Sequence, residues 1–177
     1  MKSWLVFFYM FLLLGSVYAE SVDEKCVKEV YKEPNFAQAI STCQQAIEFN
    51  KADFKLYQAL GGAYFATEDY KNAIANYQKV IELNPSNIHY IWHANNMMGR
   101  ASGYLYNFDS AVEYFRKAIK AEGNNLESHI NLAATLRYMK RLDEAKAAYH
   151  KALEVAQSNG NKEDIDFLKK EINKYGF

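Results

Sequence analysis

Along most of this chain, apolar side chains recur three and four positions apart in short segments separated by polar residues. The clearest segment contains Tyr57, Leu60, Gly61 and Tyr64 on one stripe. That spacing predicts an amphipathic helix with one buried face. The polar stretch at 67–69 predicts a turn, after which a second segment of the same kind begins. The pattern therefore predicts helical hairpins.

A small residue opens the second helix of each predicted hairpin. These residues are Ala39, Ala73, Ala111 and Ala145, at intervals of 34, 38 and 34 positions. A fixed period in this range is typical of stacked repeats, in which each unit buries its apolar face against its neighbours. The sequence therefore predicts an all-α solenoid with an extended concave surface, an architecture that usually serves binding.

One unit resembles the tetratricopeptide repeat family almost throughout. The matching positions are Tyr57, Leu60, Gly61, Tyr64, Ala73, Tyr77 and Pro85. The resemblance implies a right-handed α-solenoid of about four hairpins, over residues 20–53, 54–87, 92–125 and 126–159. In the first unit, mainly the second helix matches the family pattern. Four extra residues before the third unit predict that its first helix is longer. An amphipathic stretch at 161–175 is expected to cap the array.

The first 19 residues have the features of a secretory signal peptide. Lys2 precedes the apolar run Trp4–Leu14, and small residues follow at Val17 and Ala19. We expect cleavage between Ala19 and Glu20, because the apolar run is shorter than the roughly 20 residues that span a bilayer. An uncleaved membrane anchor is the alternative. The expected mature chain is exported, in a bacterial periplasm or secreted.

The overall charge excludes several kinds of partner. The chain has 21 basic and 21 acidic residues, so removal of Lys2 leaves a net charge near −1. A nucleic-acid-binding protein would show a dense basic face, and recruitment to an anionic membrane would need a polybasic segment. We therefore expect a protein or peptide partner, no nucleic acid, and no stable membrane anchor after cleavage.

The sequence offers little that indicates catalysis. His89 and His93 are four positions apart, as two zinc ligands on a helix would be. They lack a third ligand nearby in the sequence, and their segment is otherwise apolar, so packing or groove lining is the better interpretation. We expect a non-enzymatic protein with no cofactor and no metal.

The resemblance also places the two cysteines. Cys26 takes the position of Leu60, and Cys43 takes that of Tyr77, positions that face each other within one hairpin. Since the chain is expected to be exported, we predict a structural disulfide between them. Two buried free thiols are the alternative.

In this family the first helix of each hairpin lines the concave groove. The residues placed there as a partner-binding surface are Lys55, Gln58, Phe65, His93, Asn96, Arg100, Tyr104, Arg137 and Tyr138. The amides can pair with an extended backbone, the arginines with carboxylates, and the tyrosines give rigid apolar contact. The family's carboxylate clamp for chaperone tails is not implied, because Glu24 and Ala59 occupy two of its places.

We therefore predict a scaffold or adaptor of the periplasm or cell envelope that binds a peptide or helix in this groove. The alternative is a structural protein that self-associates. Its contact surface would be the apolar residues Ile88, Tyr90 and Ile91.

Overall fold

The computed structural model describes residues 21–32, 35–49 and 53–177, and the regular structure in these ranges is entirely helical. The helices are α2 (Val22–Tyr31), α3 (Phe36–Phe49), α4 (Phe54–Ala66), α5 (Tyr70–Leu83), α6 (Ile88–Tyr104), α7 (Phe108–Ala121), α8 (Leu126–Tyr138), α9 (Leu142–Asn159) and α10 (Lys162–Tyr175).

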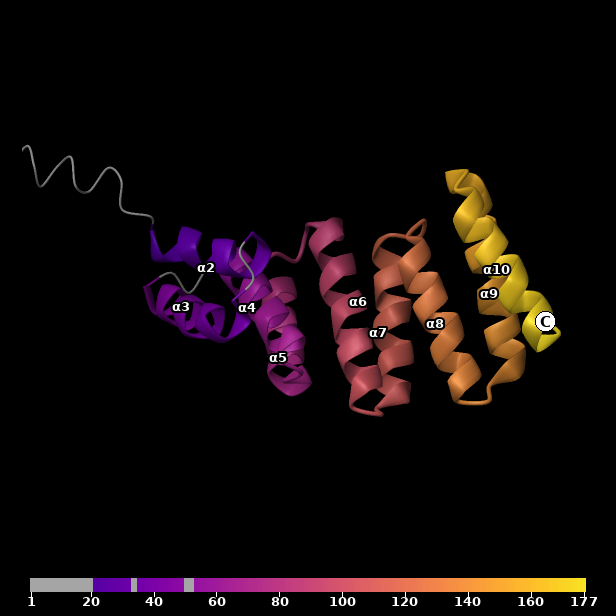
Figure 1. Ribbon diagram of the computed structural model, residues 1–177, viewed down its shortest axis with the longest axis horizontal. Helices are drawn as coiled ribbons and strands as arrows, with labels where there is room; N and C mark the ends of the chain where they lie inside the picture. Colours follow the sequence, from indigo (N-terminus) through magenta and orange to yellow (C-terminus); the bar gives the residue numbers. More distant parts are fainter. Residues whose placement is uncertain (1–20, 33–34, 50–52) are drawn as a thin grey trace, which may run out of the picture.

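Successive helices stack side by side in one row, from α2 and α3 at one end to α10 at the other (Figure 1). The predicted all-α solenoid is thus confirmed. Within the described ranges, no helix is both long enough and apolar enough to cross a membrane. The predicted cleavage site between Ala19 and Glu20 lies outside the described residues.

Short polar side chains set where helices begin. Asp53 accepts a hydrogen bond from the backbone N–H of Lys55 at 2.8 Å, and Asp69 accepts one from Asn72 at 3.2 Å. Asn87, Asn125 and Asn161 cap α6, α8 and α10 in the same way. Each such cap satisfies a backbone donor that the first turn of a helix leaves unpaired.

Three hairpins turn through the same unusual backbone conformation. Glu68, Tyr106 and Lys140 have φ values of 63°, 62° and 62°. In each turn the N–H of the following residue donates to the carbonyl five positions earlier, at 2.8 to 3.0 Å. Non-glycine residues rarely adopt this left-handed conformation, and a bulky ring such as that of Tyr106 disfavours it further.

Small residues allow the helices to approach closely. Ala39, Ala73, Ala111 and Ala145 are all fully buried. They share the core with larger side chains such as Tyr77, which is 2% exposed. The alanine period therefore marks the points at which neighbouring helices meet.

The third hairpin departs from the others at its first helix. Helix α6 has 17 residues, whereas α4 and α8 have 13 each. The four extra residues noted in the sequence therefore form an additional helical turn. That turn carries Ile88, which is 61% exposed.

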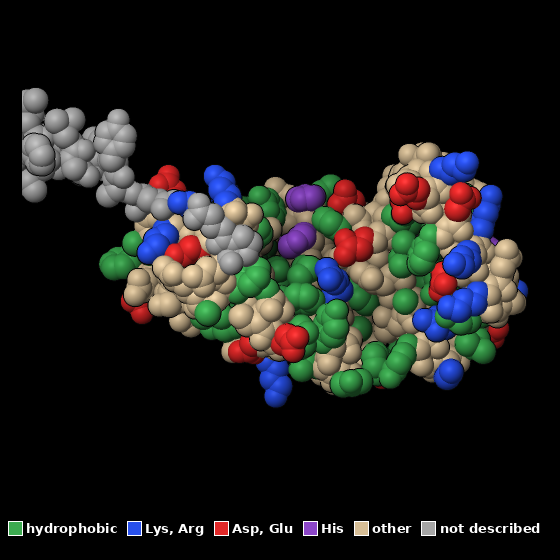
Figure 2. All heavy atoms as spheres, in the orientation of Figure 1, with side chains coloured by type: hydrophobic (Ala, Val, Ile, Leu, Met, Phe, Trp, Pro, Cys, Tyr) green, Lys and Arg blue, Asp and Glu red, His purple; other side chains and the backbone are tan. Residues whose placement is uncertain are grey.

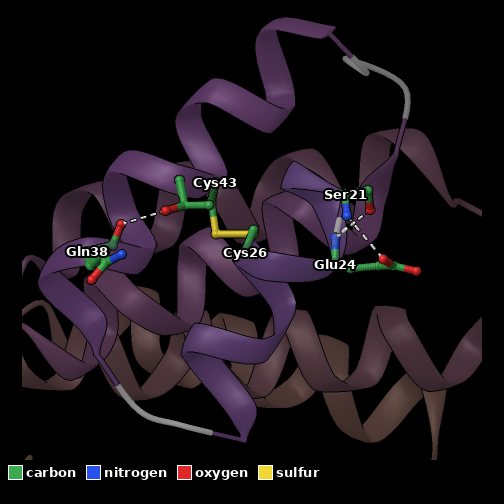
Figure 3. Close-up of a disulfide and its surroundings, with 6 residues drawn as sticks. Ser21, Glu24, Cys26, Gln38 and Cys43 are labelled. Atoms are coloured by element: carbon green, nitrogen blue, oxygen red, sulfur yellow. Dashed lines mark hydrogen bonds between the residues drawn. A yellow bond between two sulfur atoms is a disulfide. The ribbon is translucent and has the colours of Figure 1, made fainter. Parts of the chain in front are cut away.

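A disulfide joins the two helices of the first hairpin. Cys26 on α2 and Cys43 on α3 are bonded, with their Cα atoms 4.8 Å apart (Figure 3). Both side chains are fully buried, within a cluster that includes Val30 and Leu60. The bond thus crosses the core of the hairpin whose sequence matches the family least well.

Candidate partner-binding groove

A groove of about 370 Å³ opens between α6 and α8, over the beginning of α7. Its lining is mostly aromatic and small, with two arginines. The residues are Gly99, Arg100, Gly103, Tyr104, Phe108, Phe115, Asn131, Ala134, Thr135, Arg137 and Tyr138. Four of the residues expected from the sequence, Arg100, Tyr104, Arg137 and Tyr138, therefore lie around one groove.

Large apolar side chains on this surface remain open to solvent. Tyr104 is 55% exposed, Tyr138 is 59% exposed and the neighbouring Tyr106 is 76% exposed. Figure 2 shows hydrophobic side chains gathered over the middle of the molecule, whereas charged side chains crowd the α10 end. An apolar surface of this kind on a folded domain indicates an interaction site.

Aromatic contacts across hairpins hold one rim of the groove in place. The ring of Tyr104 stacks on that of Tyr70, with centroids 4.8 Å apart, and meets Phe65 edge-on at 5.8 Å. On the other rim, Phe108 and Tyr138 have centroids 4.6 Å apart. These pairs fix rotamers before any partner arrives, which lowers the entropic cost of binding.

The sequence did not indicate Tyr70, Phe108 or Phe115 as part of this surface. They belong to second helices, which the family resemblance assigns to the other side of the array. Phe108 and Tyr70 lie in the first turns of their helices, beside the hairpin turns. Their aromatic character next to a turn was the available signal.

Arg100 is held by three neighbours yet remains accessible. Its guanidinium lies 5.1 Å from the centroid of the Phe65 ring, and Nη1 lies 3.6 Å from Glu127 Oε1. Nη1 also approaches Met97 Sδ at 3.6 Å. Since the Arg100 and Glu127 side chains are 37% and 50% exposed, solvent weakens this ion pair. A carboxylate from a partner could therefore replace Glu127.

Arg137 is engaged with the capping helix. Its guanidinium lies 4.4 Å from the centroid of the Tyr175 ring on α10. Hydrogen bonding by the Tyr149 side chain raises the pKa of Arg137, which keeps it charged. Arg137 therefore links the fourth hairpin to the cap as well as lining the groove.

The sequence predicts that Asn96 faces the groove, but its side chain is buried. It is 2% exposed, and its Oδ1 accepts hydrogen bonds from Ser128 Oγ at 3.4 Å and Asn131 Nδ2 at 3.2 Å. Trp92 Nε1 donates to Ser128 Oγ at 2.8 Å, which extends the network. The Asn96 amide is therefore occupied in joining α6 to α8, and it is unavailable to an extended peptide.

The other expected residues lie beside this groove or away from it. Phe65 supports its rim, whereas Gln58 is half-buried on α4, outside the lining. Lys55 lines a separate pocket of about 460 Å³ near the start of α2. His93 is half-buried, and its ring meets that of Tyr77 edge-on at 5.8 Å.

The histidines of α6 have no metal-binding arrangement around them. Among the described residues, no group of three or more histidine, cysteine or acidic side chains could hold an ion. His89 instead lies 3.9 Å from Glu122 Oε2. Burial, then the charges of His89 and Arg100, lower the pKa of His93, while Glu127 acts in the opposite direction.

The residues considered for self-association, Ile88, Tyr90 and Ile91, differ in their surroundings. Ile88 is exposed, but Tyr90 packs against Phe54 with ring centroids 4.6 Å apart. Ile91 is half-buried and lines a different groove together with Ile88. These residues therefore do not form one continuous exposed patch.

Comparison with known proteins identifies the repeat. Three tetratricopeptide repeat models match residues 54–87, 93–125 and 126–158. No curated protein sequence matches the chain.

Among solved structures, several MamA proteins have a similar fold. One crystal structure of MamA aligns with a TM-score of 0.71 at 21% identity, covering 81% of this chain and 78% of that chain. MamA from Desulfovibrio magneticus RS-1 gives 0.68 at 15% identity, over 89% and 95%. MamA of strain AMB-1 gives 0.66 at 25% identity, over 81% and 85%.

Proposed function

This chain belongs to the tetratricopeptide repeat family, and from that membership we propose that it is a non-enzymatic scaffold holding a segment of a partner protein in the groove between α6 and α8. The family and the fold support a protein-interaction role. The observation that carries the finer proposal is the convergence of Arg100, Tyr104, Arg137 and Tyr138 on that groove.

The chemistry of the groove indicates what it would hold. Tyr104 and Tyr138 offer apolar contact on opposite rims, and Gly103 leaves open space between them. Arg100 supplies a cation whose ion-pair partner, among the described residues, is the exposed carboxylate of Glu127. A segment with a large apolar side chain and a nearby carboxylate fits these features, because rigid aromatic anchors and paired charges dominate interface energies.

We propose that the protein acts after export, in the periplasm or cell envelope or outside the cell. Two features support this location. The apolar run Trp4–Leu14 with Ala19 behind it has the pattern of a cleaved signal, and the Cys26–Cys43 disulfide suits an oxidising compartment. Mass spectrometry of the protein from its native source tests this, since a mature chain beginning at Glu20 is expected and an intact Met1 would contradict it.

The test of the groove uses a variant that spares the cap contact of Arg137. Residues 20–177 serve as bait in affinity capture from the source organism, beside the same bait carrying Tyr104→Ala and Tyr138→Ala. A matched control carries Tyr31→Ala and Tyr57→Ala, two changes of the same kind outside this groove. We expect a partner that wild type and control retain and that the groove variant loses. Equal retention by all three would exclude the groove as the binding site.

A further inference from the structure

A second groove, of about 440 Å³, lies between α5 and α7, the second helices of two adjacent hairpins. Its lining is largely aliphatic, with positive charge at one side. The residues are Gln78, Ile81, Ile88, Ile91, Asn95, Lys117, Lys120 and Ala121. It shares none of these residues with the groove between α6 and α8.

The extra turn of α6 builds one wall of this second groove. Ile88 and Ile91 both belong to the first turn of the lengthened helix. Ile88 is 61% exposed, and Leu83 at the end of α5 is 38% exposed. Leaving two branched aliphatic side chains in water forgoes the free energy that their burial would contribute. The insertion thus adds apolar surface without covering it.

The corresponding groove one hairpin later, of about 370 Å³ between α7 and α9, is crossed by an ion pair. Between α7 and α9, Arg116 Nη2 lies 3.0 Å from Glu144 Oε2, and Arg141 contacts the same carboxylate. The alanine period aligns Arg116 with Gln78, and Glu144 with Ser110. Neither Gln78 nor Ser110 carries charge. At these two positions the groove between α5 and α7 therefore has no equivalent ion pair across it.

The groove between α5 and α7 carries positive charge. Of the described residues that line it, Lys117 and Lys120 are the charged ones. Among the ion pairs of the described residues, neither lysine has a carboxylate partner, although Lys117 Nζ lies 5.3 Å from the centroid of the Tyr114 ring. Their charges are thus available to a ligand.

We propose that the groove between α5 and α7 docks an amphipathic helix of a partner protein, with an aliphatic stripe toward Ile81, Ile88 and Ile91 and acidic residues beside Lys117 and Lys120. A helix with apolar residues three and four positions apart lays one face into such a groove. Carboxylates along its edge would meet the lysines, which sets orientation and selectivity. The protein would then join two partners through separate surfaces.

The experiment uses a synthetic helical peptide as the probe. Leucines occupy positions i, i+3, i+4 and i+7, with glutamates on both sides of the stripe, and the comparison peptide has lysine in place of every glutamate. Binding to residues 20–177 is followed by fluorescence anisotropy at low and moderate salt. We expect the acidic peptide to bind at least about tenfold more tightly than the basic one, with the difference shrinking as salt rises.

Matched variants locate the peptide. Lys117→Glu with Lys120→Glu should weaken binding of the acidic peptide at least about tenfold. Lys146→Glu with Lys162→Glu, an equal charge change on exposed positions of α9 and α10, should leave it unchanged. Tyr104→Ala with Tyr138→Ala, in the other groove, should also leave it unchanged, which separates this proposal from the function proposed above.

Three results would overturn the proposal. Equal affinity for the acidic and basic peptides would exclude selection by the lysines. Unchanged binding to the Lys117→Glu and Lys120→Glu variant would place the peptide elsewhere. Concentration-dependent self-association that this variant abolishes, seen by sedimentation, would assign the groove to a second copy of the chain.

Discussion

The ring of Phe115 lies directly against the backbone of Gly99, so that a β-carbon at position 99 would be 2.6 Å from Phe115 Cε1. Phe115 is 3% exposed and forms part of the floor of the groove between α6 and α8. Absence of a side chain at position 99 is therefore what allows α6 and α7 to approach so closely.

We predict that Gly99→Ala lowers the free energy of unfolding by about 1–3 kcal/mol, because Phe115 must shift within a packed core. Gly103→Ala in the same helix is the matched control, since a β-carbon there would meet no described atom within 4 Å. That change should leave stability the same or raise it by up to about 1 kcal/mol. Urea unfolding of both variants measures this, and similar effects at the two sites would contradict the packing argument.

The buried network between α6 and α8 predicts a coupling energy. Ser128→Ala leaves Trp92 Nε1 without its acceptor and should destabilise the protein by about 1–3 kcal/mol. In the background Trp92→Phe, which removes the donor, the same serine change should cost less. A double-mutant cycle from urea unfolding measures the difference. Strictly additive effects would show that this hydrogen bond contributes nothing.

We predict that replacing Tyr106 by glycine stabilises the folded protein. Because its φ of 62° is strained for a bulky side chain, Tyr106→Gly should raise the free energy of unfolding by up to about 1 kcal/mol. Tyr104→Gly, two positions earlier in helical backbone, should instead destabilise through its helix propensity and the lost stack on Tyr70. Thermal unfolding distinguishes them, and a lower midpoint for Tyr106→Gly would show that its ring contributes more than the strain costs.

The disulfide predicts a loss of stability on its removal. Replacing Cys26 and Cys43 together by alanine opens a loop between positions 17 apart, which costs about 3 kcal/mol in the chain-entropy model, besides any lost packing. Urea unfolding of the double variant measures the loss, and wild type in reductant serves as the comparison without a change in side chains. A double variant as stable as the oxidised wild type would contradict the prediction.

We predict that His93 makes the free energy of unfolding depend on pH near neutrality. Its pKa in the folded chain lies below the ordinary value of 6.5, so the unfolded chain binds the proton more readily. The free energy of unfolding should therefore fall as pH drops below 6.5, and this contribution should level off below the folded pKa. Comparing wild type with His93→Gln by urea unfolding across this range isolates the effect. Identical slopes for the two proteins would exclude it.

The helices could be predicted from the sequence because their signal is local. Apolar spacing, capping residues and the period of Ala39, Ala73, Ala111 and Ala145 are all visible without knowledge of distant contacts. The longer α6 could also be predicted, since four added residues without a breaker extend a helix by about one turn. The Cys26–Cys43 bond followed from placing the first hairpin in the same frame.

The role of Asn96 could not be read from its position on α6. Its partner Ser128 is 32 residues away, and only the fold brings the two side chains together. One signal was present, because Ser128 takes the place that Leu56 and Ala94 hold in the preceding hairpins. All three are nearly or fully buried, and a polar residue at such a place requires a hydrogen-bonding partner.

The second groove was missed for a related reason. Ile88 and Ile91 were considered as a contact surface together with Tyr90, but residues three apart share a helix face and adjacent ones do not. The structure separates them accordingly. That uncharged Gln78 and Ser110 take the places of Arg116 and Glu144 was also missed, because this appears only when the two grooves between hairpins are compared.

Placement of the disulfide in the first hairpin has a consequence for how long the molecule survives. A linear array of repeats unravels from its ends, since an end unit has only one neighbour. Helix α10 protects one end by non-covalent contacts, whereas the other end is held in addition by a bond that a change of redox environment can open. Reduced protein should therefore be digested by proteases progressively from α2 and α3, and its lifetime becomes a property of the compartment as well as of the fold.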